Sequence, residues 1–193
     1  IVDIGYELYQ KILDEAVYEL RTEEYPELFK DIQDLPKSLD KEIAIEIDKD
    51  AFFPDNYIEN STDRFNYYKL LYNCTTNKEL EELTKEIIDK YGKLPDEAKN
   101  LIFAVRLRIA SLNTGFKKII LKNNKLIAEF SDNSDEYYYN NIFLHLVEFI
   151  NTLNNINLKQ TKTKLILEAI LKNETDAIEL LWKLKKSIEL FLQ

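Results

Sequence analysis

The sequence is poor in the residues that most often build catalytic and metal centres. Its 193 residues include three glycines, one cysteine, one histidine and no methionine. Cys74 alone cannot form an internal disulfide or a cysteine-rich zinc site, and His145 alone cannot form a metal cluster of two histidines. The glycines, at positions 5, 92 and 115, do not fit the spacing of G-x-x-x-x-G-K or G-x-G-x-x-G phosphate loops. The sequence therefore predicts neither an ATPase nor a Rossmann-type enzyme, and no metal or cofactor of its own.

Neither of the two single residues is predicted to be catalytic. Cys74 lies at the end of a predicted helix with no histidine near it in the sequence, whereas a reactive thiolate needs a cationic neighbour. Acidic pairs such as Glu81 and Glu82 are predicted to be helix-surface charge, because a hydrolase needs an acid pair that converges in a cleft. His145 is predicted to lie on the surface, since the helical period groups it with Tyr138, Asn141, Glu148 and Thr152.

Targeting and membrane signals are also absent. The chain has no basic n-region with an apolar h-region, and its apolar runs are short and interrupted by charge, so neither a signal peptide nor a transmembrane span is predicted. We expect a soluble, cytoplasmic protein. Because the chain begins at Ile1 and contains no methionine, we also expect a fragment of a longer protein. The alternative is that modified methionines are missing from the sequence, which would shift some spacings by one.

The residues that are present predict a globular, acidic chain. Apolar residues make up 45% of it, with twelve tyrosines and ten phenylalanines, which is enough for one domain with a core or two small ones. The net charge is -9. Residues 1–50 hold fifteen Asp and Glu against six Lys and Arg, whereas residues 51–193 hold twenty of each. The acidic first quarter is predicted to be a solvated face that repels nucleic acid and attracts a basic protein surface.

Hydrophobic periodicity predicts an α+β fold, in which a helical half packs with a small antiparallel sheet of hairpins and backing helices. Residues 1–41 are predicted to form an entry helix, over 4–20, and an acidic linker. Residues 42–193 are predicted to form one globular unit together with that helix. Further helices are predicted over 61–72, 77–91, 95–114, 137–153 and 174–190, and strands over 43–47, 117–122, 125–130, 157–160 and 164–169.

Turn and cap residues separate these elements. Pro54 and Asp55 mark a turn, Gly92 is a candidate left-handed helix cap, and Pro95 is expected in the first turn of the next helix. Arg64 is expected to pair with Asp55 or to cap a carbonyl. These positions are therefore candidates for scaffold roles.

Two clusters of lysine coincide with the predicted hairpins, the first of which turns at Asn123 and Asn124. One interpretation is a nucleic-acid-binding module, which is typical of unopposed basic clusters. The other is that edge-strand lysines prevent aggregation. The residues concerned are Lys117, Lys118, Lys122, Lys125, Lys159, Lys162 and Lys164.

Spaced motifs in residues 47–120 carry a family resemblance. The sequence reads Ile-Asp at 47–48, Ala-Phe-Phe-Pro-Asp-Asn-Tyr-Ile at 51–58, and Asp-Lys-Tyr-Gly-Lys-Leu-Pro at 89–95. Between them an Arg and a Tyr stand four apart, at Arg64 and Tyr68, and a Leu-Arg pair follows at 107–108, then Ala110 and Gly115. In this order the motifs resemble the C-terminal (TRCF) domain of bacterial transcription-repair coupling factors (Mfd proteins).

The resemblance extends over about 4–130, because Gly-Tyr-Glu-Leu-Tyr at 5–9 looks like the helix that enters this domain from the translocase module. Two departures from the family pattern are visible. Lys90 and Tyr91 replace the usual Arg-Phe, and Phe53 stands where Ile is common. The family-motif residues, which the resemblance marks as scaffold or interface, are Pro54, Asp55, Tyr57, Ile58, Arg64, Tyr68, Asp89, Gly92, Pro95 and Arg108.

The resemblance implies a regulatory function. Proteins of that family are ATP-dependent double-stranded DNA translocases that displace stalled RNA polymerase and recruit UvrA in transcription-coupled nucleotide excision repair. ATP and magnesium serve the motor upstream, whereas the C-terminal domain lacks ATPase motifs. It packs on the N-terminal UvrB-like module of the same chain and hides the UvrA-binding surface. We therefore expect a non-catalytic, autoinhibitory interaction domain, with the nucleic-acid-binding module as the alternative.

Overall fold

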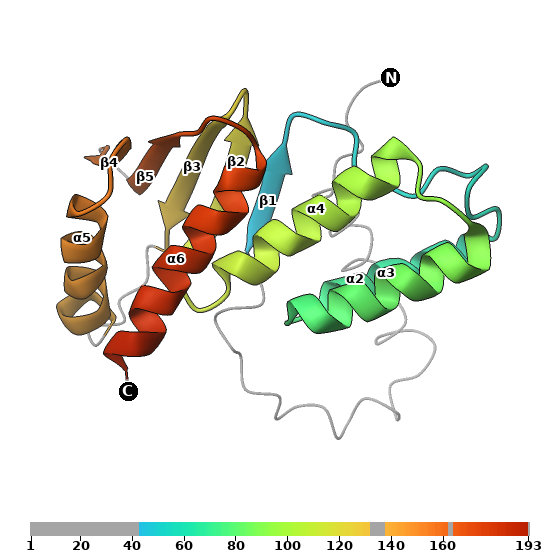
Figure 1. Cartoon of the computed structure of the whole chain (residues 1–193), viewed down its shortest axis with the longest axis horizontal. Coiled ribbons are helices and arrows are strands. Elements are labelled where there is room, and N and C mark those ends of the chain that lie inside the picture. The colour runs from blue at the N-terminus through green and yellow to red at the C-terminus, as the bar shows by residue number, and fades with distance from the viewer. Residues whose placement is uncertain (1–42, 132–137, 162–163, 193) are drawn as a thin grey trace, which may run out of the picture.

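The computed structural model describes residues 43–131, 138–161 and 164–192. Within these ranges the fold is α+β, with five α-helices and a five-stranded mixed sheet (Figure 1). This confirms the fold class predicted from the sequence. The predicted entry helix over 4–20 and the acidic linker lie outside the described residues.

The helices and strands follow the predicted ranges closely. The strands are β1 (Ala44–Ile47), β2 (Phe116–Lys122), β3 (Lys125–Phe130), β4 (Ile156–Gln160) and β5 (Leu165–Ile170). The helices are α2 (Ser61–Asn73), α3 (Asn77–Tyr91), α4 (Asp96–Ser111), α5 (Phe143–Asn151), which a short π-helix (Tyr138–Ile142) precedes, and α6 (Thr175–Phe191).

Local capping explains where the helices of the first half begin and end. The Asn60 side chain accepts the Asp63 amide at the start of α2, and Thr76 forms a reciprocal capping box with Glu79 at the start of α3. Gly92 is the C-cap residue of α3, as predicted, and its positive φ of 86° suits glycine. Its ψ of −164° lies outside the αL region, so it is not the left-handed cap that the sequence suggested. Pro95 is the N-cap residue of α4 and so stands one position before its first turn.

The strand order is β1-β2-β3-β5-β4. The four strands of the two hairpins pair antiparallel throughout, as predicted, and the first hairpin turns at Asn123 and Asn124 with φ of 50° and 58°. β1, by contrast, joins the edge of the sheet parallel to β2. Parallel neighbours need a long crossover, and here helices α2, α3 and α4 supply it between the two strands.

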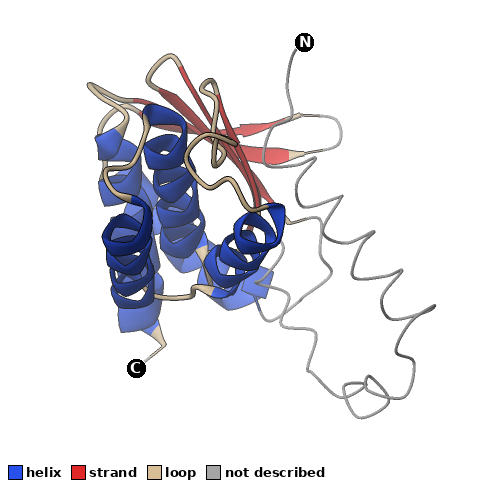
Figure 2. Cartoon of the chain, turned by 90° about the vertical axis from the view of Figure 1, so that its right-hand side faces the viewer, coloured by secondary structure: helices blue, strands red, loops and turns tan. Residues whose placement is uncertain are grey.

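Two hydrophobic cores share helix α4. One core joins the inner face of the sheet to α5, α6 and one side of α4, which contributes Ala104, Leu107 and Ala110. The other joins the loop after β1 to α2, α3 and the opposite side of α4, which contributes Leu101 and Val105 among others. Figure 2 shows helices on one face of the sheet only, among the elements it describes. Within the described ranges, no helix is both long and apolar enough to cross a bilayer.

Candidate functional site

The first family motif forms a tight loop between β1 and α2. The carbonyl of Pro54 accepts the amides of Tyr57 and Ile58, at 2.9 and 3.1 Å, which closes the turn predicted there. Ile58 is fully buried. Arg64, in the first turn of α2, reaches back to this loop and donates from Nη1 to the Ile58 carbonyl at 2.5 Å.

Arg64 satisfies both roles that its position predicts. Besides the carbonyl of Ile58, Nη1 donates to that of Glu59 at 3.1 Å, and Nη2 lies 2.9 Å from the Asp55 carboxylate. The Asp55 side chain is 89% exposed, so this ion pair contributes little by itself. Arg64 therefore stabilises the loop mainly through its hydrogen bonds to the two carbonyls.

Two tyrosines attach the loop to the helices. The Phe53 amide donates to the Tyr68 hydroxyl at 2.7 Å, and the two rings pack with centroids 5.2 Å apart. The Tyr57 hydroxyl donates to the carbonyl of Gly92 at 2.8 Å, across the end of α3. Burial raises the pKa of Tyr57, so its hydroxyl keeps the proton that it donates. The second motif, around Gly92, is thus fastened to the first.

Arg108 is the most deeply buried charged residue of the described chain, at 1% exposure. Its Nη2 donates to the carbonyls of Leu71 and Cys74 at 3.2 and 2.6 Å, and its guanidinium lies over the Tyr72 ring. These carbonyls close the C-terminal end of α2, where the helix dipole is negative. Burial, and then the charge of Glu79, raise the pKa of the Cys74 thiol against the opposing effect of Arg108.

Asp89 differs from the other family-motif residues. It stands in the last turn of α3, is exposed, and makes no hydrogen bond or ion pair with any residue that the structure describes. Each of the other nine is buried in a core, ends a helix or holds a turn. Asp89 is therefore the one motif residue of the ten without a visible scaffold role.

A polar and aromatic network beside Asp89 was not predicted. The Tyr91 hydroxyl donates to the Asp63 carboxylate at 2.7 Å, and Lys90 Nζ lies 3.1 Å from the same carboxylate and 4.9 Å from the Tyr91 ring centre. Lys90 and Tyr91 are the positions at which the sequence departs from Arg-Phe. The hydroxyl that Tyr91 adds relative to the usual phenylalanine is therefore the group that binds Asp63. In the sequence, the only signal of this contact is the departure from Arg-Phe at these two positions.

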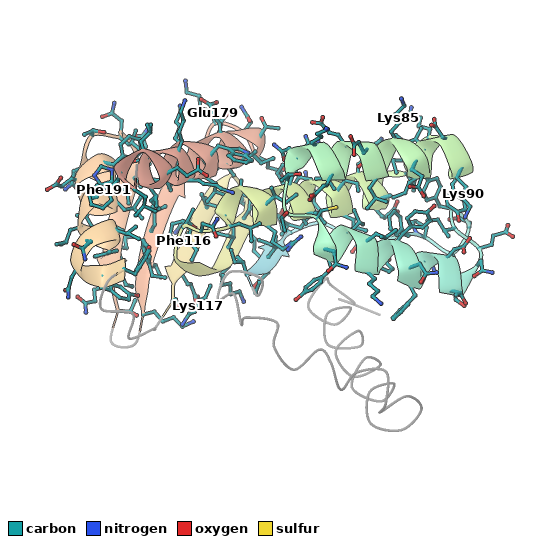
Figure 3. All side chains as sticks on the ribbon, turned by 90° about the horizontal axis from the view of Figure 1, so that it is seen from below. Lys85, Lys90, Phe116, Lys117, Glu179 and Phe191 are labelled. Carbon is teal, nitrogen blue, oxygen red and sulfur yellow. The ribbon has the colours of Figure 1, made fainter. Side chains whose placement is uncertain are left out.

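The same network raises the pKa of Tyr67 to about 12, through burial and the hydrogen bond that its hydroxyl donates to Glu86 at 3.0 Å. Figure 3 shows Lys85 and Lys90 at the α2–α3 end of the molecule, far from Phe116 and Phe191 in the half that contains the sheet. The motif cluster and the sheet therefore occupy opposite ends of the domain.

His145 corrects a prediction. It is half-buried rather than on the surface, because its ring stacks on Phe191 at 4.6 Å and its Nε2 lies 3.0 Å from the Ser187 hydroxyl. The helical period placed it on the polar face of α5, but α6 packs against that side of the helix. The contacts are a ring and a hydroxyl, so they indicate a packing role.

The hairpin lysines are largely compensated. Glu46 pairs with Lys118 and Lys122, Glu168 with Lys125 and Lys159, and Glu129 with Lys164. Lys162 lies outside the described residues. A nucleic-acid surface needs lysines that are open to phosphate, so these pairs weigh against that interpretation.

An open hollow of about 530 Å³ lies between the end of β1 and the start of α4. Asp48, Asp50, Asp96 and Glu97 line it together with lysines. The Asp48 carboxylate accepts the Asn123 amide at 2.9 Å, and Lys99 holds the pKa of Asp96 below its usual range. A general acid needs the opposite shift, so Asp96 does not fit that role. No group of three metal-ligating side chains occurs among the described residues.

Comparison with known proteins identifies the family. The TRCF domain model matches residues 47–141, which begins with the first motif and extends beyond the predicted limit of 130. The transcription-repair-coupling factor of Buchnera aphidicola is 36% identical over 132 residues, which are 68% of this chain and 15% of that protein. The factor of Rickettsia bellii is 25% identical over 191 residues, which are 96% of this chain and 15% of that protein.

A solved structure has the same fold. The crystal structure of the C-terminal domain of a transcription-repair coupling factor superposes with a TM-score of 0.60 at 20% identity, over 80% of this chain and 97% of the other. The chain spans about 15% of the length of the two relatives above, so it corresponds to one part of such a protein. Motifs, family match and fold agree, and the chain contains a TRCF domain, the C-terminal domain of transcription-repair coupling factor.

Proposed function

We propose that this chain is a non-catalytic regulatory domain that restrains the transcription-repair coupling factor to which it belongs. It binds the N-terminal UvrB-like module of its own parent and covers the surface that UvrA needs. The ATP and magnesium chemistry, translocation on double-stranded DNA and displacement of RNA polymerase belong to the rest of the parent, in the bacterial cytoplasm. The domain itself needs no cofactor for this role.

The observation that carries the proposal is Asp89. This charged residue of the family motif is exposed and makes no hydrogen bond or ion pair with the residues that the structure describes. Contact with a partner gives its charge a role. Its carboxylate stands at the end of α3, where the Tyr57–Gly92 hydrogen bond and the Tyr91–Asp63 pair hold the backbone in place. A rigid mounting of this kind presents the charge to a partner at low entropic cost.

The net charge of the helical half favours a basic partner surface. Residues 48–100, which include α2, α3 and the loops beside them, hold twelve Asp and Glu against eight Lys and Arg. An acidic surface attracts a basic surface and accelerates the encounter with it. Because autoinhibition must be released, we expect an interface of moderate size and polar character.

Calorimetric titration of the isolated N-terminal module with this chain tests the proposal. Asp89→Asn should weaken binding about tenfold, which is the loss of about 1.4 kcal/mol expected for one exposed interfacial charge. Glu81→Gln is the matched control, since Glu81 is an exposed acid on the same helix outside the family motif. No heat of binding at high concentration, or equal effects of the two variants, would contradict the role of Asp89.

The nucleic-acid alternative has its own test. Duplex DNA titrated with the chain at low salt should give a flat curve, because the hairpin lysines are paired with glutamates. Binding that weakens steeply with added salt would instead favour the alternative.

A further inference from the structure

The second face of the sheet has a distinct chemistry. Alternation along the strands sends residues such as Ile45, Ile119 and Leu126 into the core, and their neighbours to the other side. No helix of the described residues packs on that side (Figure 2). We call it the open face; its residues are Glu46, Lys118, Ile120, Lys122, Lys125, Ile127, Glu129, Asn157, Lys159, Ile166, Glu168 and Ile170.

The centre of the open face is apolar. Ile120 stands directly opposite Ile127 in the register of β2 and β3, and Ile166 and Ile170 lie on β5. None of the four belongs to either hydrophobic core, and Ile170 is 70% exposed. Four isoleucines on one face of a sheet form an apolar patch, and such a patch is typical of a surface that another segment or molecule covers.

Lysines surround this centre, with glutamates set deeper between them. Lys125 and Lys159 both pair with Glu168, at 2.8 and 2.7 Å, and the Glu168 side chain is only 13% exposed. Lys118 and Lys122 share Glu46 in the same way. Lys164 pairs with Glu129, so on this side of the rim three lysines share two glutamates.

A segment of the same chain has the complementary composition. Residues 23–35, which we call the acidic segment, hold five Asp and Glu, one lysine, and the apolar residues Tyr25, Leu28, Phe29, Ile32 and Leu35. A segment that mixes acidic and apolar side chains suits a surface of isoleucines surrounded by lysines. The segment lies outside the described residues, so the complementarity rests on its composition alone.

The connection to the sheet is short enough to favour this occupant. Seven residues separate Leu35 from Ile43, where the described chain begins beside β1 at the edge of the open face. Extended, they span roughly 25 Å at about 3.3 Å per residue. The face is about 19 Å wide from β1 to β4, at about 4.8 Å between neighbouring strands. The segment can therefore reach every strand, and its effective concentration there is high.

We propose that the acidic segment docks in cis on the open face, with its apolar side chains on the isoleucines and its carboxylates opposite the rim lysines. Docking hides the apolar centre from other molecules and opposes nucleic acid at the lysines. The proposal rests on the sheet and the charge pattern, and does not depend on the role of Asp89.

Zero-length carbodiimide cross-linking of the whole chain at low concentration tests the docking. Amide cross-links should join carboxylates of residues 23–35 to Lys122, Lys125, Lys159 or Lys164, as mapped by mass spectrometry. Lys69 and Lys85, which are exposed on the helical half, are the control lysines and should give at least tenfold lower yields. Equal yields from both sets would overturn the proposal.

Isotope mixing and one pair of variants complete the test. With equal amounts of light and heavy chain, the cross-links should be unmixed; mixed products would show a second copy as the occupant and overturn docking in cis. Phe29→Ser should lower the yield at least fivefold without removing a reacting group, and Leu39→Ser, outside the segment, should leave it unchanged. A yield that Phe29→Ser does not alter would also contradict the proposal.

Discussion

Single buried residues fix the positions of the helices in this domain, and Arg108 is the clearest example. Its charge is buried without a carboxylate partner among the described residues, yet two carbonyls at the end of α2 accept its hydrogen bonds. Hydrogen bonds from a charged donor are worth about 1.5–3 kcal/mol each. Arg108 therefore fixes α4 against α2, and through α2 it fixes the motif loop.

Replacing this arginine should be costly. Arg108→Ala removes both hydrogen bonds and leaves a cavity, so we expect a loss of about 3–4 kcal/mol in the free energy of unfolding. Arg106→Ala, at a half-buried position two residues earlier on α4, should cost less than about 1 kcal/mol. Urea unfolding measures both, and similar losses would contradict the role assigned to Arg108.

Asp63 gives the domain a defined response to acid. The hydrogen bond from Tyr91, and then that from Lys90, hold the pKa of Asp63 below its ordinary value of 3.8. A carboxyl whose pKa is lower in the folded state stabilises the fold above its unfolded pKa, and this contribution disappears as the pH falls through the folded pKa. Its window therefore lies below about pH 4.

Tyr91→Phe should raise the pKa of Asp63 toward the ordinary value, because the hydrogen bond that lowers this pKa most is lost. Carbon-detected NMR titration of the carboxyl group measures the shift. Tyr57→Phe, which removes a hydroxyl that donates to Gly92 instead, should leave the pKa of Asp63 where it is. An unchanged pKa in Tyr91→Phe would mean that Lys90 alone accounts for the depression.

At the scale of elements, two glycines end helices or begin strands under different constraints. Gly92 and Gly115 both have positive φ, at 86° and 79°. A Cβ at Gly92 would meet nothing within 4 Å, whereas a Cβ at Gly115 would lie 2.1 Å from the Tyr138 ring. The Tyr138 ring therefore packs so closely on the turn before β2 that only glycine fits at position 115.

Alanine at the two positions should separate these constraints. Gly92→Ala should lower the free energy of unfolding by about 1–3 kcal/mol, through backbone strain alone. Gly115→Ala should introduce a similar strain and must also displace Tyr138, whose hydroxyl donates to the Thr114 carbonyl at 2.6 Å. We expect it to lower the thermal midpoint clearly further, by calorimetry. Equal midpoints would show that Tyr138 moves aside freely.

The elements also show how far sequence reasoning reaches. Caps, turns and both hairpins were predictable because their signals are local: Gly92, Asn123 and Asn124 act within a few residues. The parallel pairing of β1 was not, because it depends on a crossover of three helices. The half-burial of His145 was missed for a similar reason, since Phe191 and Ser187 lie more than forty residues away in the chain.

At the scale of the whole molecule, helix α4 makes one unit of two cores. Trp182 packs against both cores and so connects them a second time. The candidate site was predictable to the extent that its motifs are local, and the resemblance named all ten residues. Which charged residue of the ten is both exposed and unpaired among the described residues was not, because the packing of α2, α3 and α4 decides which partners Asp89 can reach.

The shared helix predicts a single unfolding transition. Leu107→Ala, in the sheet core, and Leu101→Ala, in the other, should each cost about 2–5 kcal/mol and shift the same transition. Trp182 fluorescence and circular dichroism should coincide in both variants. Leu70→Ala, at a site that is 47% exposed, should cost far less. Two separate transitions would contradict a single cooperative unit.

The affinity of the full-length parent for UvrA tests the central claim most directly. Asp89→Lys introduced into the parent should open the autoinhibitory contact and raise the affinity for UvrA about tenfold or more, as deletion of the domain should. Glu81→Lys, with the same change of charge on the same helix, should leave the affinity unaltered. A parent whose affinity for UvrA is unchanged both by Asp89→Lys and by deletion of the domain would contradict the account.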